Sequence, residues 1–344
     1  IVIFSLFILF VLIRDLHPRW TDVLQARADF FQTITMIIYL AGVFVTYLTY
    51  KVYNTMTSGK CTCKTKLNNK VVIVTGANTG IGFETAKDLA RREAKVILAC
   101  RDQAKGIRAR DDIIKATGNH NVVYKHLDLA SFKSVRTFAS QILETETHIH
   151  VLINNAGTGK LDNSLTEDNL PVEMQINHFG PFLLTKLLLP MIKTSSPSRI
   201  INVSSLLHRY GTIDLDNIHK PAKRWLQHSR VYSNSKLANV LFTKRLSRDL
   251  LGTGVTVNCL HPGAVSTDIF RHQPALSRFL ISLVFKLPEE GAQTSIHLAV
   301  SPELCDVTGK YFSDCIETAS SCRSEDKELA DKLWELSDKI TKEK

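Results

Sequence analysis

The chain has 344 residues, of which 44% are hydrophobic and 22% charged, so it is long and apolar enough to bury a full core. Its net charge is +10, and eight basic and three acidic side chains in residues 1–70 supply +5 of that excess. Because this basic stretch includes an apolar leader, it indicates contact with a membrane surface and argues against a nucleic-acid partner. The remainder has the length of one α/β domain, which excludes a second folded domain.

The seven cysteines form neither the paired framework of a secreted module nor the double Cys-x-x-C of a zinc site. This pattern predicts a reducing compartment and no metal centre. Cys61 and Cys63 follow the leader, where palmitoylation is an alternative to the free thiols that we expect.

The leader contains a stretch that can cross a bilayer. Residues 30–50 are 21 residues without a charge, and a helix of that length spans roughly 31 Å. Residues 1–13 are also apolar and form a possible additional membrane segment. The alternative is a cleaved signal peptide, which the length of the second stretch and its distance from the first residue disfavour.

The charges around this stretch predict its orientation. On its N-terminal side three arginines are balanced by three aspartates, whereas the other side carries only lysines: Lys51, Lys60, Lys64, Lys66 and Lys70. The excess of basic residues places the C-terminal part in the cytosol. We therefore expect residues 1–66 to be a membrane anchor with a basic linker, and residues 67–344 to be a domain on the cytosolic face of the endoplasmic reticulum. A lipid droplet or a mitochondrial membrane is the alternative location.

Residues 71–82 read Val-Val-Ile-Val-Thr-Gly-Ala-Asn-Thr-Gly-Ile-Gly. Four apolar residues followed by Gly76, Gly80 and Gly82 predict a buried parallel strand that turns tightly into a helix. Backbone amides at such a helix N-terminus attract phosphate, and glycine allows a cofactor to approach the main chain. The stretch therefore predicts a pyrophosphate-binding turn.

Strands and helices alternate along the rest of the chain. We expect further strands at residues 95–99, 122–126, 150–154, 199–204, 256–260 and 310–312. We expect helices at residues 83–92, 103–117, 131–147 and 173–193, from Tyr232 onward, and at the C-terminus after a cap at Ser324. This alternation predicts an α/β fold: a single doubly wound, Rossmann-type parallel sheet with helices on both faces, preceded by a transmembrane helix.

The end of the second strand distinguishes the two nicotinamide cofactors. An NAD enzyme usually has an acidic residue here for the ribose diol, whereas this chain has Cys100-Arg101. A guanidinium suits a 2′-phosphate, so NADP(H) is favoured, although Asp102 argues the other way. Asp128, at the exit of the third strand, is a candidate contact to the adenine.

Tyr232 and Lys236 are four residues apart and therefore share one helix face. An ammonium near a phenol favours phenolate, and such a tyrosine can exchange a proton with a carbonyl or an alcohol. Ser205, at the end of a neighbouring strand, is placed to hydrogen-bond the same substrate oxygen. The pair alone is common on helix surfaces; its combination with the glycine turn and a strand-terminal serine makes it specific.

These residues resemble the short-chain dehydrogenase/reductase family over residues 66–340. The matching motifs are Thr75-Gly76-x-x-x-Gly80-x-Gly82, Asn154-Asn155-Ala156-Gly157, Asn177, Ser204-Ser205, Tyr232-x-x-x-Lys236 and Pro262-Gly263-x-Val265-x-Thr267. Within the family the chain is most similar to the microsomal retinol dehydrogenases, through Ala99-Cys100-Arg101-Asp102, Ser235-Lys236-Leu237-Ala238-Asn239 and Phe312-Ser313-Asp314-Cys315.

The resemblance implies a role for each motif. Tyr232 would be the general acid/base, Lys236 would hold the nicotinamide ribose and lower the tyrosine pKa, and Ser205, with Ser204 as the fallback, would orient the substrate. Asn177 would support a water-mediated proton path. The cofactor-binding set would be Gly76, Asn78, Thr79, Gly80, Ile81, Gly82, Arg101, Asp128, Asn155, Ala156, Gly157, Tyr232, Lys236, Pro262, Gly263, Val265 and Thr267.

The substrate side is less clearly marked. Residues 269–287 are rich in apolar side chains, in a segment that family members use as a flap, although core packing explains the pattern equally well. Pro181 and Thr158-Gly159-Lys160 depart from the family pattern nearby. With a membrane anchor beside it, an apolar flap suits a lipophilic substrate.

We therefore expect NADPH-dependent interconversion of a lipophilic aldehyde or ketone and its alcohol, with retinal and retinol first, by a possible homodimer. The alternatives are a steroid or general carbonyl reductase, and a membrane-tethered NADP-binding scaffold without turnover. His208, His219 and His228 lack metal-ligand spacing, and we expect them to face solvent.

Overall fold

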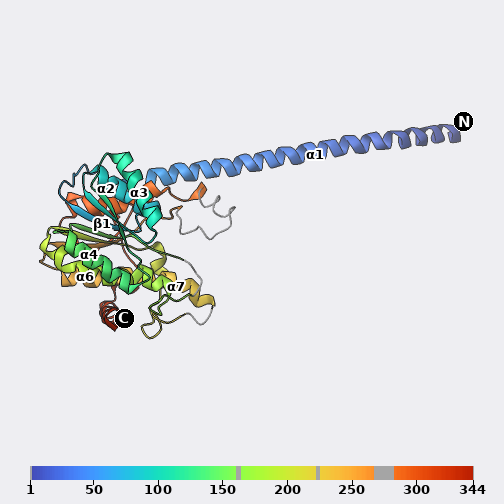
Figure 1. The fold of residues 1–344 in the computed structure, drawn as a ribbon. Coiled ribbons are helices and arrows are strands. Elements are labelled where there is room, and N and C mark those ends of the chain that lie inside the picture. The colour runs from blue at the N-terminus through green and yellow to red at the C-terminus, as the bar shows by residue number, and fades with distance from the viewer. Residues whose placement is uncertain (1, 160–163, 222–224, 267–282, 344) are drawn as a thin grey trace. The chain divides into compact units, whose positions relative to one another are not determined.

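The computed structural model describes residues 2–159, 164–221, 225–266 and 283–343. The chain divides into two compact units, Ile1–Thr57 and Ser58–Lys344. The first unit is the helix α1 (Val2–Thr57), and the second contains one sheet with helices on both sides (Figure 1).

Helix α1 is continuous, so the two apolar stretches expected at residues 1–13 and 30–50 belong to one helix rather than to two segments. Its part Gln25–Asn54 is long and apolar enough to cross a membrane, and none of that part is buried by protein. A helix of similar composition in the core of a soluble protein would be mostly buried. The part Gln25–Asn54 is therefore an apolar helix that no protein core covers.

The second unit is built on one eight-stranded sheet with the strand order β3-β2-β1-β4-β5-β6-β7-β8. All neighbouring strands are parallel except the last pair, β7 and β8, which is antiparallel. The strands are β1 (Val71–Thr75), β2 (Lys95–Cys100), β3 (Val122–His126), β4 (Val151–Asn154), β5 (Ser198–Val203), β6 (Val255–His261), β7 (Tyr311–Ser313) and β8 (Ile316–Glu317). The strand order reverses between β1 and β4, which is where ligands bind in such sheets.

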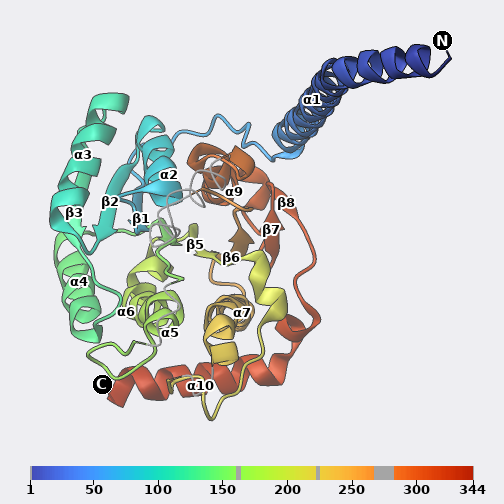
Figure 2. The same cartoon turned by 90° about the vertical axis from the view of Figure 1, so that its right-hand side faces the viewer.

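Helices cover both faces of the sheet (Figure 2). One face carries α2 (Gly80–Arg91), α3 (Gln103–Thr117) and α9 (Pro288–Val300); the other carries α4 (Phe132–Thr145), α6 (Gly180–Thr194) and α7 (Trp225–Asp249), with α10 (Lys327–Glu343) packed against α7. Strand β1 shows the two layers, because Ile73 belongs to one buried apolar cluster and Val72 and Val74 belong to the other. The expected doubly wound parallel sheet is confirmed.

The N-terminal ends of α7 and α10 differ from expectation. Helix α7 begins at Trp225, before Tyr232, so the catalytic candidates lie inside the helix and not in its first turn. Helix α10 is not capped by Ser324: Asp326 Oδ1 accepts the N–H of Leu329, while Ser324 is buried in a short 3-10 turn. Strand β8 was not expected, since two exposed residues give no strand pattern.

Candidate active site

The glycine turn after β1 leaves no room for side chains. Gly76 has a φ of +66°, and a Cβ built there would lie 2.9 Å from the Cα of Ala156. A Cβ on Gly82 would lie 2.4 Å from Nδ2 of Asn155. Helix α2 begins at Gly80, so the turn directs the N-terminus of the helix toward the carboxyl ends of β1 and β4. Asn78, Thr79 and Ile81 are half-buried in the same turn.

Thr75 and Asn155 join the ends of these two strands. The hydroxyl of Thr75 accepts the N–H groups of Asn155 and Ala156, each at 3.0 Å, and Nδ2 of Asn155 donates to the carbonyl oxygen of Thr75 at 2.8 Å. The two strand ends are therefore held in register around the glycine turn. Gly157 follows, and a Cβ on it would lie 3.2 Å from Nζ of Lys236.

Asn177 lies in a five-residue π-helical segment, Gln175–Phe179, between α5 (Val172–Met174) and α6. Its Nδ2 donates to the carbonyl oxygen of Thr158 and to Oγ of Ser235, both at 2.9 Å, and its Oδ1 accepts the N–H of Thr158 at 2.8 Å. Both amide hydrogens are thus engaged, and the second lone pair of Oδ1 is the capacity that remains. Irregular helical turns of this kind are frequent at functional sites.

Tyr232 and Lys236, inside α7, come together with Ser205, which follows the end of β5. Nζ of Lys236 lies 5.6 Å from the centre of the Tyr232 ring and donates to the carbonyl oxygen of Val203 at 3.1 Å. Ser205 is the side-chain hydrogen-bond partner of the phenol, and this contact lowers the pKa of Tyr232. The face of α7 that carries Tyr232 and Lys236 therefore lies against the end of β5, which Ser205 follows.

Burial dominates the electrostatics of this group. It raises the pKa of Tyr232 above its ordinary value, and the hydrogen bond from Ser205 opposes this only in part. The pKa of Tyr232 is therefore raised and not lowered as expected, because loss of solvation outweighs the hydrogen bond from Ser205. Burial also lowers the pKa of Lys236, to about 8.

The two adjacent serines have different surroundings. Ser204 is buried, and its Oγ donates to the carbonyl oxygen of Lys236 at 2.7 Å. Ser205 Oγ accepts the N–H of Leu207 at 3.2 Å and contacts the phenol. Ser204 thus supports the helix backbone, and Ser205 faces Tyr232.

Arg101 and Asp102 follow β2, and both are exposed. Asp102 is the N-cap of α3, where its side chain accepts the N–H of Lys105 at 3.0 Å. The acidic residue that argued against NADP is thus engaged by its own helix. Asp128 is half-buried, and its Oδ1 accepts the N–H of Ala130 at 3.0 Å.

The segment after β6 completes the crevice, which is the site at the carboxyl ends of β1, β4, β5 and β6. Gly263 has a φ of +87°, and its N–H donates to Nδ1 of His261 at 3.1 Å. Val265 is buried and forms a parallel bridge with Lys286. Pro262 precedes this turn, while Thr267 and residues 269–282 of the expected flap lie outside the described residues.

Lys286 was missed in the sequence. It is buried, its ammonium pairs with Asp314, and its side chain lies 3.0 Å from a Cβ built on Gly263. Nothing in the spacing of residues 263, 286 and 314 indicates this contact, because it forms only through the tertiary fold.

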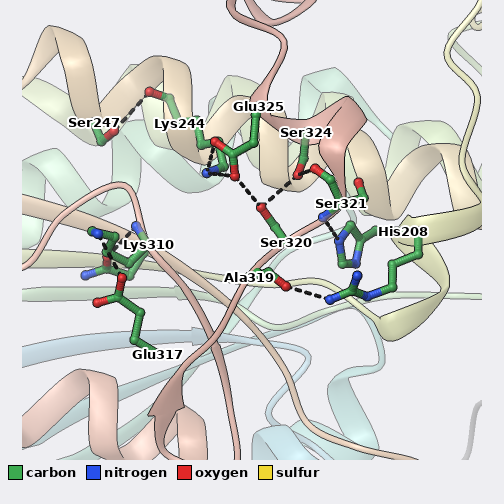
Figure 3. A network of polar contacts seen from close by, with 12 residues as sticks. His208, Lys244, Ser247, Lys310, Glu317, Ala319, Ser320, Ser321, Ser324 and Glu325 are labelled. Atoms are coloured by element: carbon green, nitrogen blue, oxygen red, sulfur yellow. Dashed lines mark hydrogen bonds and ion pairs between the residues drawn. The ribbon is translucent and has the colours of Figure 1, made fainter.

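His208 was expected to face solvent, and this was wrong: its side chain is fully buried. The N–H of Ser321 donates to Nε2 of His208 at 3.0 Å (Figure 3). Nδ1 of the same ring lies 2.8 Å from the carbonyl oxygen of Ser205. Because Nε2 accepts, the neutral ring carries its proton on Nδ1 and donates it to Ser205. Burial lowers the pKa of His208, which favours this neutral form.

Figure 3 also shows how the segment that meets His208 is fixed. Lys244 pairs with Glu325 at 2.7 Å, Ser320 Oγ donates to the same carboxylate at 2.9 Å, and Ser324 Oγ donates to Ser320 Oγ at 2.8 Å. Helix α7 therefore holds the segment that reaches His208, and His208 in turn contacts the carbonyl oxygen of Ser205.

Comparison with known proteins identifies the family. Residues 70–275 match the family model described as short chain dehydrogenase. The chain is 48% identical to human retinol dehydrogenase 13 over 287 residues, which cover 81% of this chain and 86% of the relative. It is 45% identical to human retinol dehydrogenase 11 over 284 residues, covering 82% of this chain and 89% of the relative.

Solved structures agree with these relatives. An uncharacterized protein from Mycobacterium paratuberculosis superimposes with a TM-score of 0.64 at 32% identity, covering 81% of this chain and 95% of that protein. A protein of Escherichia coli CFT073, solved with NADPH, gives a TM-score of 0.58 at 25% identity over 72% of this chain and 97% of that protein. The chain belongs to the short-chain dehydrogenase/reductase family, as a dehydrogenase related to the retinol dehydrogenases that acts on CH–OH groups.

Proposed function

We propose that this dehydrogenase reduces a lipophilic aldehyde or ketone, with retinal as its first substrate, at the expense of NADPH. The observation that carries the proposal is the group formed by Tyr232, Lys236 and Ser205 beside a glycine turn in which a Cβ on Gly76 would lie 2.9 Å from the Cα of Ala156. The names of the relatives, retinol dehydrogenases at 45–48% identity, support the substrate.

The residues of the crevice fit a dinucleotide, because the glycine positions would be filled by any side chain. Gly76, Asn78, Thr79, Gly80, Ile81 and Gly82 would hold the pyrophosphate, Arg101 and Asp128 the adenosine, and Asn155, Ala156, Gly157, Tyr232, Lys236, Pro262, Gly263, Val265 and Thr267 the nicotinamide half. When bound, the nicotinamide supplies the hydride, and the protein supplies position and a proton.

The proton step follows from the ionisation of the phenol. Burial raises the pKa of Tyr232, so at neutral pH the phenol is protonated and is the form that donates a proton to a carbonyl oxygen. Oxidation of an alcohol needs the opposite form, the phenolate. In reduction Ser205 would therefore orient the substrate oxygen and the phenol would protonate it, and in the reverse reaction the phenolate would accept that proton.

Lys236 and Asn177 support this step. The Lys236 ammonium would bind the nicotinamide ribose from its position between the phenol and the carbonyl oxygen of Val203. Asn177 has one lone pair of Oδ1 left for a water molecule, which would return a proton to Tyr232. Asn177 also fixes Thr158, the residue after the Asn-Asn-Ala-Gly turn.

NADPH is preferred over NADH in this proposal because Arg101 is exposed at the end of β2 while Asp102 is engaged as a helix cap. A guanidinium matches a phosphate in charge and geometry.

A membrane location supports the lipophilic substrate. The helix Gln25–Asn54 is long and apolar enough to cross a membrane, and a retinoid or fatty aldehyde partitions into the same bilayer. We place the enzyme in the endoplasmic reticulum membrane with its catalytic unit in the cytosol, since the lysines after the helix outnumber acidic residues there.

The test uses the full chain in detergent or lipid nanodiscs. Retinal, a steroid ketone and a fatty aldehyde are each offered with NADPH and with NADH, and the Tyr232→Phe variant is the control. We expect NADPH oxidation fastest with retinal and about 10²- to 10⁴-fold slower in the variant, which keeps its NADPH affinity. Turnover of the steroid alone would identify a steroid reductase. NADPH binding without turnover of any substrate would instead support a membrane-tethered NADP-binding scaffold without enzymatic activity.

A further inference from the structure

Three metal-ligating side chains meet away from the crevice. Sγ of Cys61, Sγ of Cys63 and one ring nitrogen of His297 all lie within 4.8 Å of one another, and the three residues are half-buried. In a tetrahedral zinc site, bonds of about 2.3 Å to sulfur and about 2.0 Å to nitrogen place neighbouring ligand atoms roughly 3.5–3.8 Å apart. Small side-chain rotations would bring the three atoms to that spacing.

The backbone that carries the two thiols is already fixed against the helix that carries the imidazole. The N–H of Cys61 donates to Oε1 of Gln293 at 3.1 Å. Gln293 and His297 are four residues apart on α9, so they share the face that meets this segment. A guanidinium from α2's C-terminal end, that of Arg92, donates to the carbonyl oxygens of Cys63 at 2.6 Å and Thr65 at 3.1 Å.

The positions of the cysteines also suit a shared ligand. Residues 60–66 have no helical or strand structure, and in an extended chain residues two apart project to the same side. Cys61 and Cys63 are half-buried and pack against the apolar cluster to which α9 contributes. The segment therefore presents two thiols to His297 without a change of fold.

We propose that Cys61, Cys63 and His297 bind a thiophilic divalent cation, Zn²⁺ first. Two thiolates and an imidazole are the donors that zinc prefers, whereas Mg²⁺ and Ca²⁺ require oxygen ligands. Binding releases the two thiol protons to solvent, and the two negative charges that remain balance the ion. A water molecule occupies the fourth position.

The site would fasten the segment after Thr57 to α9. Residues 58–66 follow the first unit and precede β1, and hydrogen bonds, partial packing of the two cysteines and an ion pair of Lys66 hold them in the second unit. A metal ion bound by Cys61, Cys63 and His297 would add metal–ligand bonds, which are stronger than these hydrogen bonds. The sequence predicted no metal centre because His297 lies far along the chain from the two cysteines, and only the fold brings them together.

The experiment uses the full chain in detergent, reduced and stripped of metal with a chelator, and Co²⁺ as the probe. One equivalent of Co²⁺ should give thiolate charge-transfer and tetrahedral d–d absorption bands, and Zn²⁺ should abolish them. The variants Cys61→Ser, Cys63→Ser and His297→Gln should each weaken Co²⁺ binding at least about 10-fold. Cys322→Ser, which removes an exposed cysteine outside the cluster, should bind as the parent does.

A second measurement separates binding from folding. Zn²⁺ should raise the thermal unfolding temperature of the parent chain and of Cys322→Ser, and leave that of His297→Gln unchanged. Circular dichroism verifies that each variant is folded. The proposal is overturned if the reduced chain gives no bands, if His297→Gln keeps them, or if the isolated protein carries an acyl group or a disulfide on Cys61 and Cys63. None of these outcomes bears on the reductase activity, which is measured separately.

Discussion

Nζ of Lys236 donates a hydrogen bond to the carbonyl oxygen of Val203, 3.1 Å away at the end of β5. The lysine is buried, and burial lowers its pKa to about 8. The ammonium thus sits close to its titration range at physiological pH, while the Tyr232 phenol, whose pKa is raised, stays protonated well above it.

This difference predicts the alkaline limb of the pH profile. Above about pH 8 Lys236 loses its proton before Tyr232 does. The charged fraction of Lys236 then falls about tenfold with each further pH unit, and kcat/KM for NADPH-dependent reduction should fall with it. The profile is measured between about pH 6 and pH 10 at constant ionic strength. Lys236→Arg keeps its charge throughout and should show a lower rate without this limb. A parent profile that is flat through about pH 9 would contradict the assignment.

Arg101 should determine the choice of cofactor. Arg101→Gln removes a charge-assisted contact to the 2′-phosphate and should raise the KM for NADPH roughly 10- to 100-fold, while the KM for NADH changes little. Lys105→Gln, which neutralises another exposed cation on α3, is the matched control and should keep the preference. An equal rise for both cofactors would show that Arg101 does not read the phosphate.

The adjacent serines should separate chemistry from stability. Ser205→Ala removes the partner of the Tyr232 phenol and should lower kcat roughly 100-fold. Ser204→Ala removes a buried hydrogen bond to the carbonyl oxygen of Lys236 and should lower the free energy of unfolding by about 1 kcal/mol, with a smaller effect on kcat. Steady-state rates and urea unfolding of both variants check this. The reverse pattern would make Ser204 the substrate-orienting residue.

Gly82→Ala should damage the cofactor crevice directly. The new methyl group would lie 2.4 Å from both Nδ2 of Asn155 and the carbonyl oxygen of Gly76. The hydrogen bonds of Asn155 that join the ends of β1 and β4 must therefore lengthen or break. We expect the Kd for NADPH, measured by fluorescence, to rise at least about 10-fold. Gly118 is the control: its φ is +72°, and no atom lies within 4 Å of a Cβ built on it. Gly118→Ala should therefore cost about 1 kcal/mol of stability and leave the Kd for NADPH unchanged.

The sequence predicted the parts of this structure that depend on local pattern. The apolar run at residues 71–74, followed by glycines, predicted a buried strand, and Gly76 and Gly82 mark positions where other backbone approaches closely. It failed where burial by distant segments decides the result. His208 lies in a polar stretch yet is covered by Ser321, and the pKa of Tyr232 is raised because the fold removes water from the phenol.

The buried His208 should couple this remote segment to catalysis. His208→Phe keeps a ring but leaves the N–H of Ser321 without a partner, while the carbonyl oxygen of Ser205 keeps only the N–H of residue 208, so it should cost about 1–3 kcal/mol of stability. It should also lower kcat, because Ser205 loses its support. Tyr311→Phe is the matched control: its hydroxyl lies 3.3 Å from Nδ1, and removing it keeps both hydrogen bonds of the imidazole.

The pH dependence of unfolding distinguishes this positioning role from simple packing. Burial lowers the pKa of His208 in the folded chain, so the unfolded chain binds its proton more readily and stability falls as the pH drops below about 6.5. His208→Phe should reduce this slope by the contribution of one group, and a double-mutant cycle with Ser205→Ala should show coupling in kcat. Additive effects on kcat, with an unchanged slope, would mean that His208 only fills space beneath the serine.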